Sequence, residues 1–168
     1  DRIVLMRAGT IEQMGSPREL FASPATEFAA RFMGFENILR GRLVRVSAGE
    51  AEIDIAGAAI RGRLVATDLR PGDAAFAAIR AEHIHIVEAA SRSNHMRGAA
   101  GAPVYKGRFT DVPFRSPAGD LMVRLDGADD VLPPEAQLSF APENCVIGSI
   151  GPESAGQEET SSIGKKHD

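Results

Sequence analysis

The printed sequence of 168 residues contains one cysteine, one tyrosine and no tryptophan. A single cysteine excludes a disulfide bond within the chain, and it makes a cysteine-rich zinc site untenable. No apolar run reaches the roughly 18 residues that a membrane-spanning helix needs. These absences exclude disulfide-built, zinc-finger and helical membrane-spanning classes.

The sequence also has no block of like charges. The net charge is −4, from 19 basic and 23 acidic residues that are spread without a block of either sign. Binding to nucleic acid through phosphate neutralisation needs a basic stripe, and single strands need aromatic stacking platforms. The composition therefore predicts no nucleic-acid partner.

The first residues predict a β-hairpin. Residues 3–6 form a short apolar run, Ala8-Gly9 supplies a turn, and residues 10–14 begin a second extended stretch. The chain opens with Asp1 next to an apolar strand. We therefore expect it to be a fragment of a longer protein.

A helix should follow the hairpin. Ser16 and Glu19 have the spacing of a capping box, in which each side chain accepts a hydrogen bond from the backbone of the other, and Pro17 suits the first helical position. We expect the helix to begin there.

A second helix is predicted from Ser23-Pro24, which repeats the same start signal. Phe28 and Phe32 fall on one helical face, and Gly34 can adopt the positive φ angle that closes a helix. We expect this helix to pack by its Phe28 and Phe32 side.

Residues 35–150 have a different texture, with short strand-like runs between turns rich in Gly, Pro and Asp. The expected strands lie at residues 37–46, 53–55, 60–65, 74–79, 84–87, 104–109, 121–125 and 138–140. Residues 89–102 look like a connector, and residues 110–116 look like a loop. This pattern predicts a mainly β fold with a small β-barrel, closed or nearly closed, preceded by a β-hairpin and two short helices.

The order of residues in the first segment resembles the ATP-binding subunits of bacterial ABC importers of the maltose, polyamine and ferric-ion type. The family pattern is Asp-Arg-Ile, an apolar strand, Gly-x-Ile-x-Gln-x-Gly, Pro-x-Glu-Leu and a Pro-led helix ending in Phe-x-Gly. The matching residues are Asp1, Arg2, Ile3, Gly9, Ile11, Gln13, Gly15, Pro17, Glu19, Leu20, Pro24, Phe32 and Gly34.

The later segment resembles the transport-associated OB-like domain (TOBE) of the same subunits. Residues 70–73 followed by 79–84 are similar to the family's turn and Ile-Arg-Pro-Glu-His pattern, and residues 140–145 are similar to its closing Pro-Glu pattern. The sequence departs from the family at Ala81, where proline is usual, and over residues 109–118.

The resemblance implies three parts: residues 1–34 as the C-terminal remnant of an ABC ATPase domain, residues 35–150 as the TOBE domain, and residues 151–168 as a polar tail. The tail is rich in Ser and Glu and has too few apolar residues to offset its ordering entropy, which predicts disorder.

The implied function is regulation and support of a homodimer. In such a subunit, ATP and Mg serve catalysis, and the complete protein lies on the cytoplasmic face of the plasma membrane against permease subunits. This chain lacks the G-x-x-x-x-G-K-[ST] phosphate loop. We therefore expect it to bind neither ATP nor another cofactor by itself, and to have no catalytic residue.

Candidate site residues are Arg80, Glu82, Glu143 and Asn144, in the two segments that match the family. The carboxylates could accept backbone hydrogen bonds near turns, and Arg80 could pair with a carboxylate across the fold. Alternatively, these charges could form a pocket rim that senses an anion or a regulatory protein.

The histidines and the cysteine predict no metal or nucleophile. His83 and His85 could share one face of a strand, but zinc needs three or four ligands, and no further ligand has suitable spacing. His95 falls in the expected connector and His167 in the tail. Cys145 has no recognisable His partner, which favours a buried thiol.

A second hypothesis comes from a different class. The chain could be a free-standing OB-like module that binds a small anion or an oligosaccharide, with the expected loop at residues 110–116 at its mouth.

Overall fold

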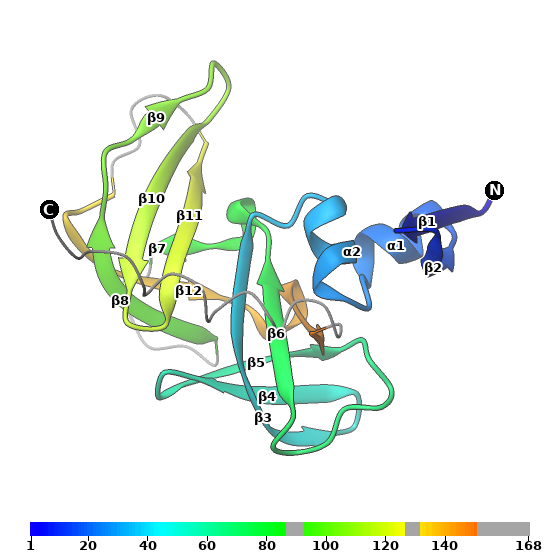
Figure 1. The fold of residues 1–168 in the computed structure, drawn as a ribbon. Coiled ribbons are helices and arrows are strands. Elements are labelled where there is room, and N and C mark those ends of the chain that lie inside the picture. The colour runs from blue at the N-terminus through cyan, green and yellow to red at the C-terminus, as the bar shows by residue number, and fades with distance from the viewer. Residues whose placement is uncertain (87–92, 127–131, 151–168) are drawn as a thin grey trace, which may run out of the picture.

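The computed structural model describes residues 1–86, 93–126 and 132–150 (Figure 1). The predicted disordered tail, residues 151–168, lies outside the described residues. The elements are β1 (Ile3–Arg7), β2 (Thr10–Gly15), α1 (Pro17–Ala22), α2 (Glu27–Phe32), β3 (Asn37–Ser47), β4 (Glu50–Ile55), β5 (Ala58–Leu64), β6 (Ala74–Ile79), η1 (Ala81–His83), β7 (His85–Ile86), β8 (Asn94–Ala100), β9 (Val104–Tyr105), β10 (Thr110–Ser116), β11 (Gly119–Leu125), β12 (Glu135–Phe140), η2 (Pro142–Asn144) and β13 (Cys145–Ser149).

A closed barrel forms the centre of the molecule, in the strand order β13-β5-β4-β3-β6. Its neighbours are antiparallel except β13 and β5, which pair in parallel and close the ring. The predicted mainly β fold with a small OB-like barrel, a hairpin and two short helices is confirmed.

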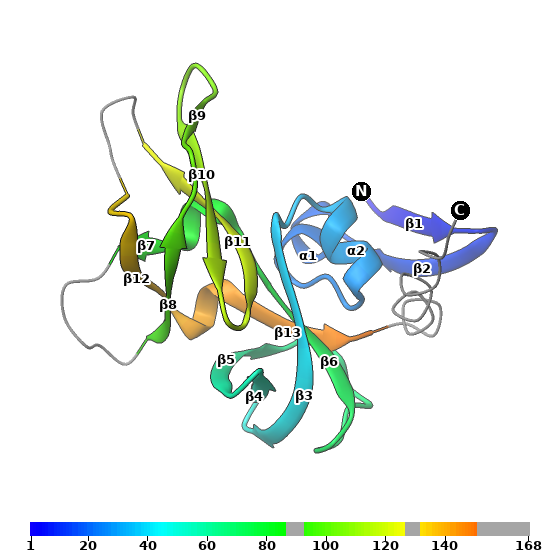
Figure 2. The ribbon, with the colours of Figure 1, turned by 60° about the vertical axis from the view of Figure 1, so that its left-hand side comes forward.

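A second sheet lies beside the barrel, in the order β11-β10-β8-β12-β7, with β9 paired to β10. Figures 1 and 2 show β3 and β6 between this sheet and the segment formed by β1, β2, α1 and α2. The sequence predicted a single barrel, and the structure adds this second sheet to it.

Residues 110–116, predicted as a loop, form strand β10. Burial alternates along this strand, with Thr110, Val112 and Phe114 buried. The charged residues and Pro113 between them made this alternation hard to recognise in the sequence. Pro113 lies opposite Met122, whose backbone groups point away from β10, so this pair needs no ladder hydrogen bond. Proline is therefore tolerated inside the strand.

The expected connector at residues 89–102 contains strand β8. Its small residues allow close packing, because a Cβ atom on Gly98 would lie 2.0 Å from the backbone oxygen of Arg115. Gly41 occupies the matching place in the barrel, where a Cβ atom would lie 2.2 Å from the Asp54 oxygen. A small residue at position 98 is thus a packing requirement of the sheet.

The two sheets exchange strands. The β domain has two halves along the chain, residues 37–86 (β3 to β7) and residues 94–149 (β8 to β13). Each half ends with a strand, a short 3-10 helix and another strand: β6, η1 and β7 in the first half, and β12, η2 and β13 in the second. Strand β7 pairs with β12, whereas β13 pairs with β6. The last strand of each half therefore completes the sheet of the other.

Two buried asparagines join the halves in the same way. Asn37 is 1% exposed; its amide donates to the Met122 carbonyl at 2.9 Å and accepts from the Met122 N–H at 2.5 Å. Asn94 is 3% exposed and makes the same pair of bonds with the backbone of Arg61, both at 2.8 Å. Each half thus binds one strand of the other, β11 or β5, through one amide side chain.

The first helix begins as predicted. The Glu19 N–H donates to the Ser16 hydroxyl at 3.3 Å, and the Ser16 N–H donates to the Glu19 carboxylate at 2.7 Å. Pro17 stands at the first helical position, and Gly34, after the second helix, has a φ of +80°.

The second helix differs from the prediction in its start and its packing. It begins after Thr26, whose hydroxyl accepts from the Ala29 N–H at 3.2 Å, while Ser23 ends the first helix. Phe28 is partly buried against the apolar cluster, as predicted, but Phe32 is 65% exposed, and Ala29 and Ala30 are buried. The helix lies close to the barrel wall, where only small side chains fit.

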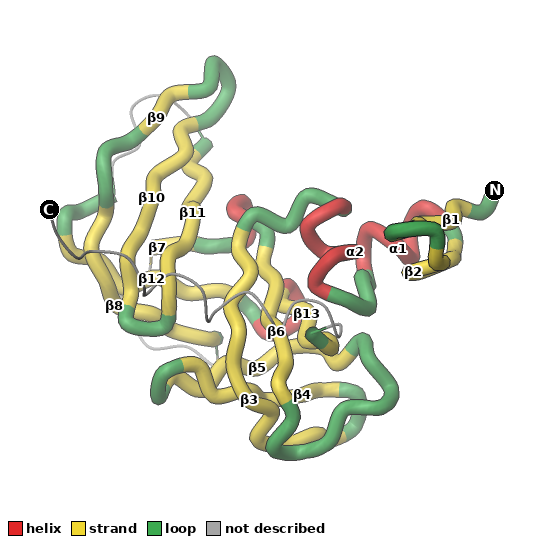
Figure 3. Tube along the Cα trace, in the orientation of Figure 1, coloured by secondary structure: helices red, strands yellow, loops and turns green. Residues whose placement is uncertain are grey.

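Two hydrophobic cores result. One fills the barrel and the inner face of the second sheet. Figure 3 shows the helices beside the barrel. The second core joins residues of the first strand, the helices and the barrel strands, namely Leu5, Leu20, Ala29, Ala30, Met33, Phe35, Phe76, Ala78 and Val146. The helices are therefore packed onto the barrel by a continuous apolar interface.

We predict that Asn94→Ala lowers the free energy of unfolding by about 1 to 3 kcal/mol, because it removes both hydrogen bonds to the Arg61 backbone in a buried place. Urea denaturation of the full chain measures the effect. Asn144→Ala is the control, since the Asn144 backbone N–H keeps its bond to the Ala141 carbonyl. Equal losses in both variants would contradict the role given to Asn94.

Candidate functional site

Arg80 lies where the helices meet the barrel. Its guanidinium donates to the carbonyls of Met33 at 3.1 Å, Phe21 at 3.3 Å and Gly34 at 3.4 Å, and it stacks 4.3 Å from the centre of the Phe35 ring. These acceptors are backbone oxygens rather than the carboxylate that the sequence suggested. Basic side chains commonly satisfy the last carbonyls of a helix in this way.

Arg63 of strand β5 also donates hydrogen bonds to the end of a helix. It donates to the Ala22 carbonyl at 2.7 Å, the Ser23 hydroxyl at 3.4 Å and the Glu143 carbonyl at 3.0 Å. The two arginines together bind the C-terminal ends of both helices to the barrel.

Two ion pairs of one buried carboxylate complete this attachment. Glu27 of α2 is 3% exposed and lies 2.9 Å from Arg40 of β3 and 2.9 Å from Arg31 of its own helix. Burial alone would raise the pKa of Glu27, but hydrogen bonds and charge from Arg40 and Arg31 outweigh burial and hold its pKa below the usual value. We call Glu27, Arg40, Arg63 and Arg80 the helix–barrel joint.

A second charged cluster surrounds Arg124 of β11. Its guanidinium lies 2.9 Å from Asp111, 3.0 Å from Glu36 and 3.6 Å from Glu82, and it stacks 4.0 Å from the centre of the Phe109 ring. The hydrogen bond to Asp111, aided by Glu36, raises the pKa of Arg124 above its usual value despite partial burial. Because residues 109–118 were expected to be irregular, no local sequence pattern indicated this cluster.

The four residues singled out from the sequence do not gather at one place. Glu82 borders a cavity of about 360 Å³ beside Arg124, whereas Arg80 belongs to the joint. Glu143 and Asn144 lie in η2, where the Glu143 carbonyl accepts from Arg63. Glu82 and Glu143 occupy matching positions in the two halves.

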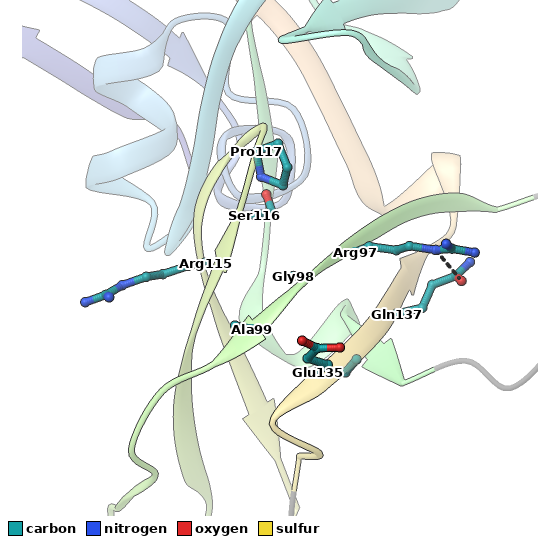
Figure 4. A pocket seen from close by; sticks show the side chains of 9 residues that line it. Arg97, Gly98, Ala99, Arg115, Ser116, Pro117, Glu135 and Gln137 are labelled. Carbon is teal, nitrogen blue, oxygen red and sulfur yellow. Dashed lines mark hydrogen bonds between the residues drawn. The ribbon is translucent and has the colours of Figure 1, made fainter.

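A larger concave site of about 630 Å³ lies on the second sheet (Figure 4). It is lined by Arg97, Gly98, Ala99, Arg115, Ser116, Pro117, Glu135, Ala136 and Gln137. Arg97 donates to the Gln137 amide oxygen at 3.3 Å, and Arg115 points away from both Arg97 and Glu135. The site therefore has charges of both signs and no converging set of one sign.

No group of three or more metal-ligand side chains occurs in the described residues. His83 lies in η1 and His85 in β7, so they do not share a strand, and His95 lies in β8. His167 is outside the described residues. Cys145 is fully buried, and burial raises the pKa of its thiol to about 12, which makes it a poor nucleophile at neutral pH. No helix in the described part of the chain is long and apolar enough to span a membrane.

The chain is similar in sequence to known ATP-binding proteins of import systems. The chain is 32% identical over 150 residues to "Fe(3+) ions import ATP-binding protein FbpC" of Rhizobium etli, covering 89% of this chain and 41% of that protein. It is 34% identical over 125 residues to "Spermidine/putrescine import ATP-binding protein PotA" of Rubrobacter xylanophilus, covering 73% and 33%. The chain thus spans about two fifths or less of the length of these relatives. No family model matches it.

A solved structure is similar in fold. The cytoplasmic molybdate-binding protein ModG, determined with molybdate bound, aligns with a TM-score of 0.57 at 16% identity, over 69% of this chain and 97% of that one. At this identity the likeness shows the fold alone.

The fold and the joint define a mainly β, OB-like domain fixed to a short helical segment. The chain belongs with the ATP-binding subunits of ABC importers and corresponds to a C-terminal part of one.

We predict that Glu27→Gln lowers the free energy of unfolding by about 2 kcal/mol at about pH 7, because it removes the charge that Arg31 and Arg40 bind. The folded pKa of Glu27 is depressed, so its stabilisation is present above about pH 4.3, the value for an unfolded glutamate, and is lost as the pH falls through the folded pKa. The two proteins should therefore converge in acid.

Urea midpoints measured from about pH 7 to about pH 3 test this. Glu52→Gln is the matched control, since Glu52 pairs with the exposed Arg45 at the surface and should change stability little. A difference for Glu27→Gln that is independent of pH would contradict the prediction.

Proposed function

We propose that this chain is the C-terminal regulatory and dimer-supporting region of an ABC transporter ATP-binding subunit. In its complete form, that subunit couples ATP hydrolysis to the import of a solute. The observation that carries the proposal is the similarity to importer ATP-binding subunits over most of the chain.

The helix–barrel joint supports a regulatory role. Residues 1–34 resemble the end of an ATPase domain, and the joint binds them to the barrel through Arg63, Arg80 and the buried Glu27. A displacement of those helices would move the barrel with them. The β domain would then report the position of the ATPase domain to a regulator or to a second subunit.

The hairpin supports attachment to a larger body. Val4 lies opposite Met14, and Met6 lies opposite Ile11, in the cross-strand register. All four side chains are exposed. An apolar face of this kind, formed by two cross-strand pairs, is typical of a surface that a further domain covers. We assign that cover to the ATPase domain.

The proposed partners are a second ATP-binding subunit, the permease subunits of an importer, and a regulatory protein or small ligand. The proposed location is the cytoplasmic face of the plasma membrane. ATP and Mg would bind to the upstream part of the complete subunit.

We predict that this chain takes up no MgATP in a calorimetric titration, whereas a version extended upstream to its native start binds it, because the phosphate loop would lie in the extension. Binding by this chain itself would contradict the proposal. Binding by neither protein would favour the second hypothesis below.

We also predict that Met6→Thr with Ile11→Thr lowers self-association of this chain and leaves its unfolding free energy nearly unchanged. In the extended protein the same pair should lower stability by about 1 to 3 kcal/mol, because the face would be buried there. Light scattering and urea denaturation measure the two effects. Val104→Thr, at an exposed site on β9, is the control, and loss of stability in both lengths alike would contradict burial by the ATPase domain.

The second hypothesis remains an OB-like module for a small anion or oligosaccharide. The ModG likeness and the two arginines of the 630 Å³ site favour it. Glu135 in the same site and the outward direction of Arg115 weigh against an anion (Figure 4). Molybdate, titrated in the same calorimetric series, discriminates between the two hypotheses.

A further inference from the structure

The two halves of the β domain differ at one place. In the barrel, β13 closes the ring by pairing in parallel with β5, with Val146 next to Arg63 and Ile147 next to Leu64. The strands at the matching positions of the second sheet are β7 and β11. Within the described residues they do not pair, and they form the two edges of that sheet.

The match between Arg124 and Arg63 follows from the asparagine bonds. Arg63 lies two residues after Arg61, which Asn94 binds, and Arg124 lies two residues after Met122, which Asn37 binds. The second sheet is therefore a barrel of the same kind left open between β7 and β11. We call the facing edges, His85–Ile86 and Arg124 with Leu125, the open seam.

The backbone of β11 is oriented to pair across the seam. The N–H and C=O groups of Met122 point away from β10, because Asn37 binds both of them. In an antiparallel ladder, alternate residues direct their backbone groups to the same side. Arg124 therefore directs its N–H and C=O into the seam, as Arg63 does toward β13 in the barrel.

A cavity of about 360 Å³ separates the two edges. Its apolar lining residues are Ile84, which is fully buried, Ile86 and Leu125. Glu82 and Asp126 supply carboxylates at its border. The seam thus combines two strand edges that pair with no other strand in the described part of the chain, apolar lining side chains and carboxylates, which are the features used when an extended peptide adds to a sheet.

The charge around the seam is negative. Among the described residues that line the cavity, Arg124 has the one guanidinium. It already faces the carboxylates of Asp111, Glu36 and Glu82, and Asp126 adds another carboxylate at the same cavity. A segment with basic side chains complements this rim.

We propose that the open seam binds an extended segment of a partner protein that carries basic side chains and adds as a strand to the edge of β11. The proposal goes beyond the transporter assignment, since it names a surface on the β domain and the chemistry of its partner. It holds for this chain with or without an ATPase domain.

A fluorescein-labelled peptide of seven alternating valines and lysines is the probe, and its binding to the full chain is followed by anisotropy. We expect saturable binding, binding about tenfold weaker when glutamates replace the lysines, and loss of binding when alternate backbone nitrogens are methylated. Amide hydrogen exchange should slow at Arg124 when the peptide is bound.

Variants locate the site. Glu82→Gln and Asp126→Asn should each lower the affinity for the lysine peptide by about two- to fivefold. Glu143→Gln is the matched control, because Glu143 occupies the position of Glu82 in the closed barrel and should have no effect. Circular dichroism confirms that each variant is folded.

Several results would overturn the proposal. They are no saturable binding, equal affinity for the glutamate peptide, equal weakening by Glu143→Gln, or slowed exchange elsewhere than β7 and β11. Complete competition by 1,4-diaminobutane would assign the cavity to a small cation instead. Protection of Arg124 that depends on protein concentration without peptide would assign the seam to a second copy of the chain.

Discussion

Strands β7 and β13 cross between the two halves of the β domain, and the remaining structure depends on that exchange. Neither half can complete its sheet with its own strands, so the halves must form together. Asn37 and Asn94 support the same arrangement, because each satisfies both backbone groups of one residue in the opposite half. A buried backbone group left without such a partner would be costly, which explains why polar side chains occupy these core positions.

The exchange also sets where the helices can attach. Strand β13 lies beside β6, and these two strands present Phe76, Ala78 and Val146 to the helices. Arg63 and Arg80 reach the helix ends from the same wall. In the other half, β7 and β12 hold the matching places, but the polar residues Gln137 and Ser139 stand there in the positions of Phe76 and Ala78. One half therefore carries the hairpin and the two helices, whereas the other half has polar side chains at the corresponding positions.

Local signals in the sequence predicted much of the framework. Ser16 and Glu19 marked the first helix, and the run at residues 74–79 marked β6, because capping and strand alternation involve neighbours in the chain. Predictions for β8, β10 and the packing of Phe32 were wrong. In each case a distant contact decided the outcome: the Arg115 backbone beside Gly98, the Met122 backbone opposite Pro113, and the barrel wall beside Ala29.

The sequence by itself determined the mainly β class, the hairpin, the first helix and the importer family, since these depend on ordered motifs and on short-range hydrogen bonds. Only the tertiary structure decided what the charged residues do. Arg80 donates hydrogen bonds to helix carbonyls, and Arg124 forms ion pairs with three carboxylates. Beside Arg124, strands β7 and β11 of the second sheet do not pair with each other in the described part of the chain. Those roles join residues that are far apart in the chain, and no local pattern specifies which distant strand edge a side chain will meet.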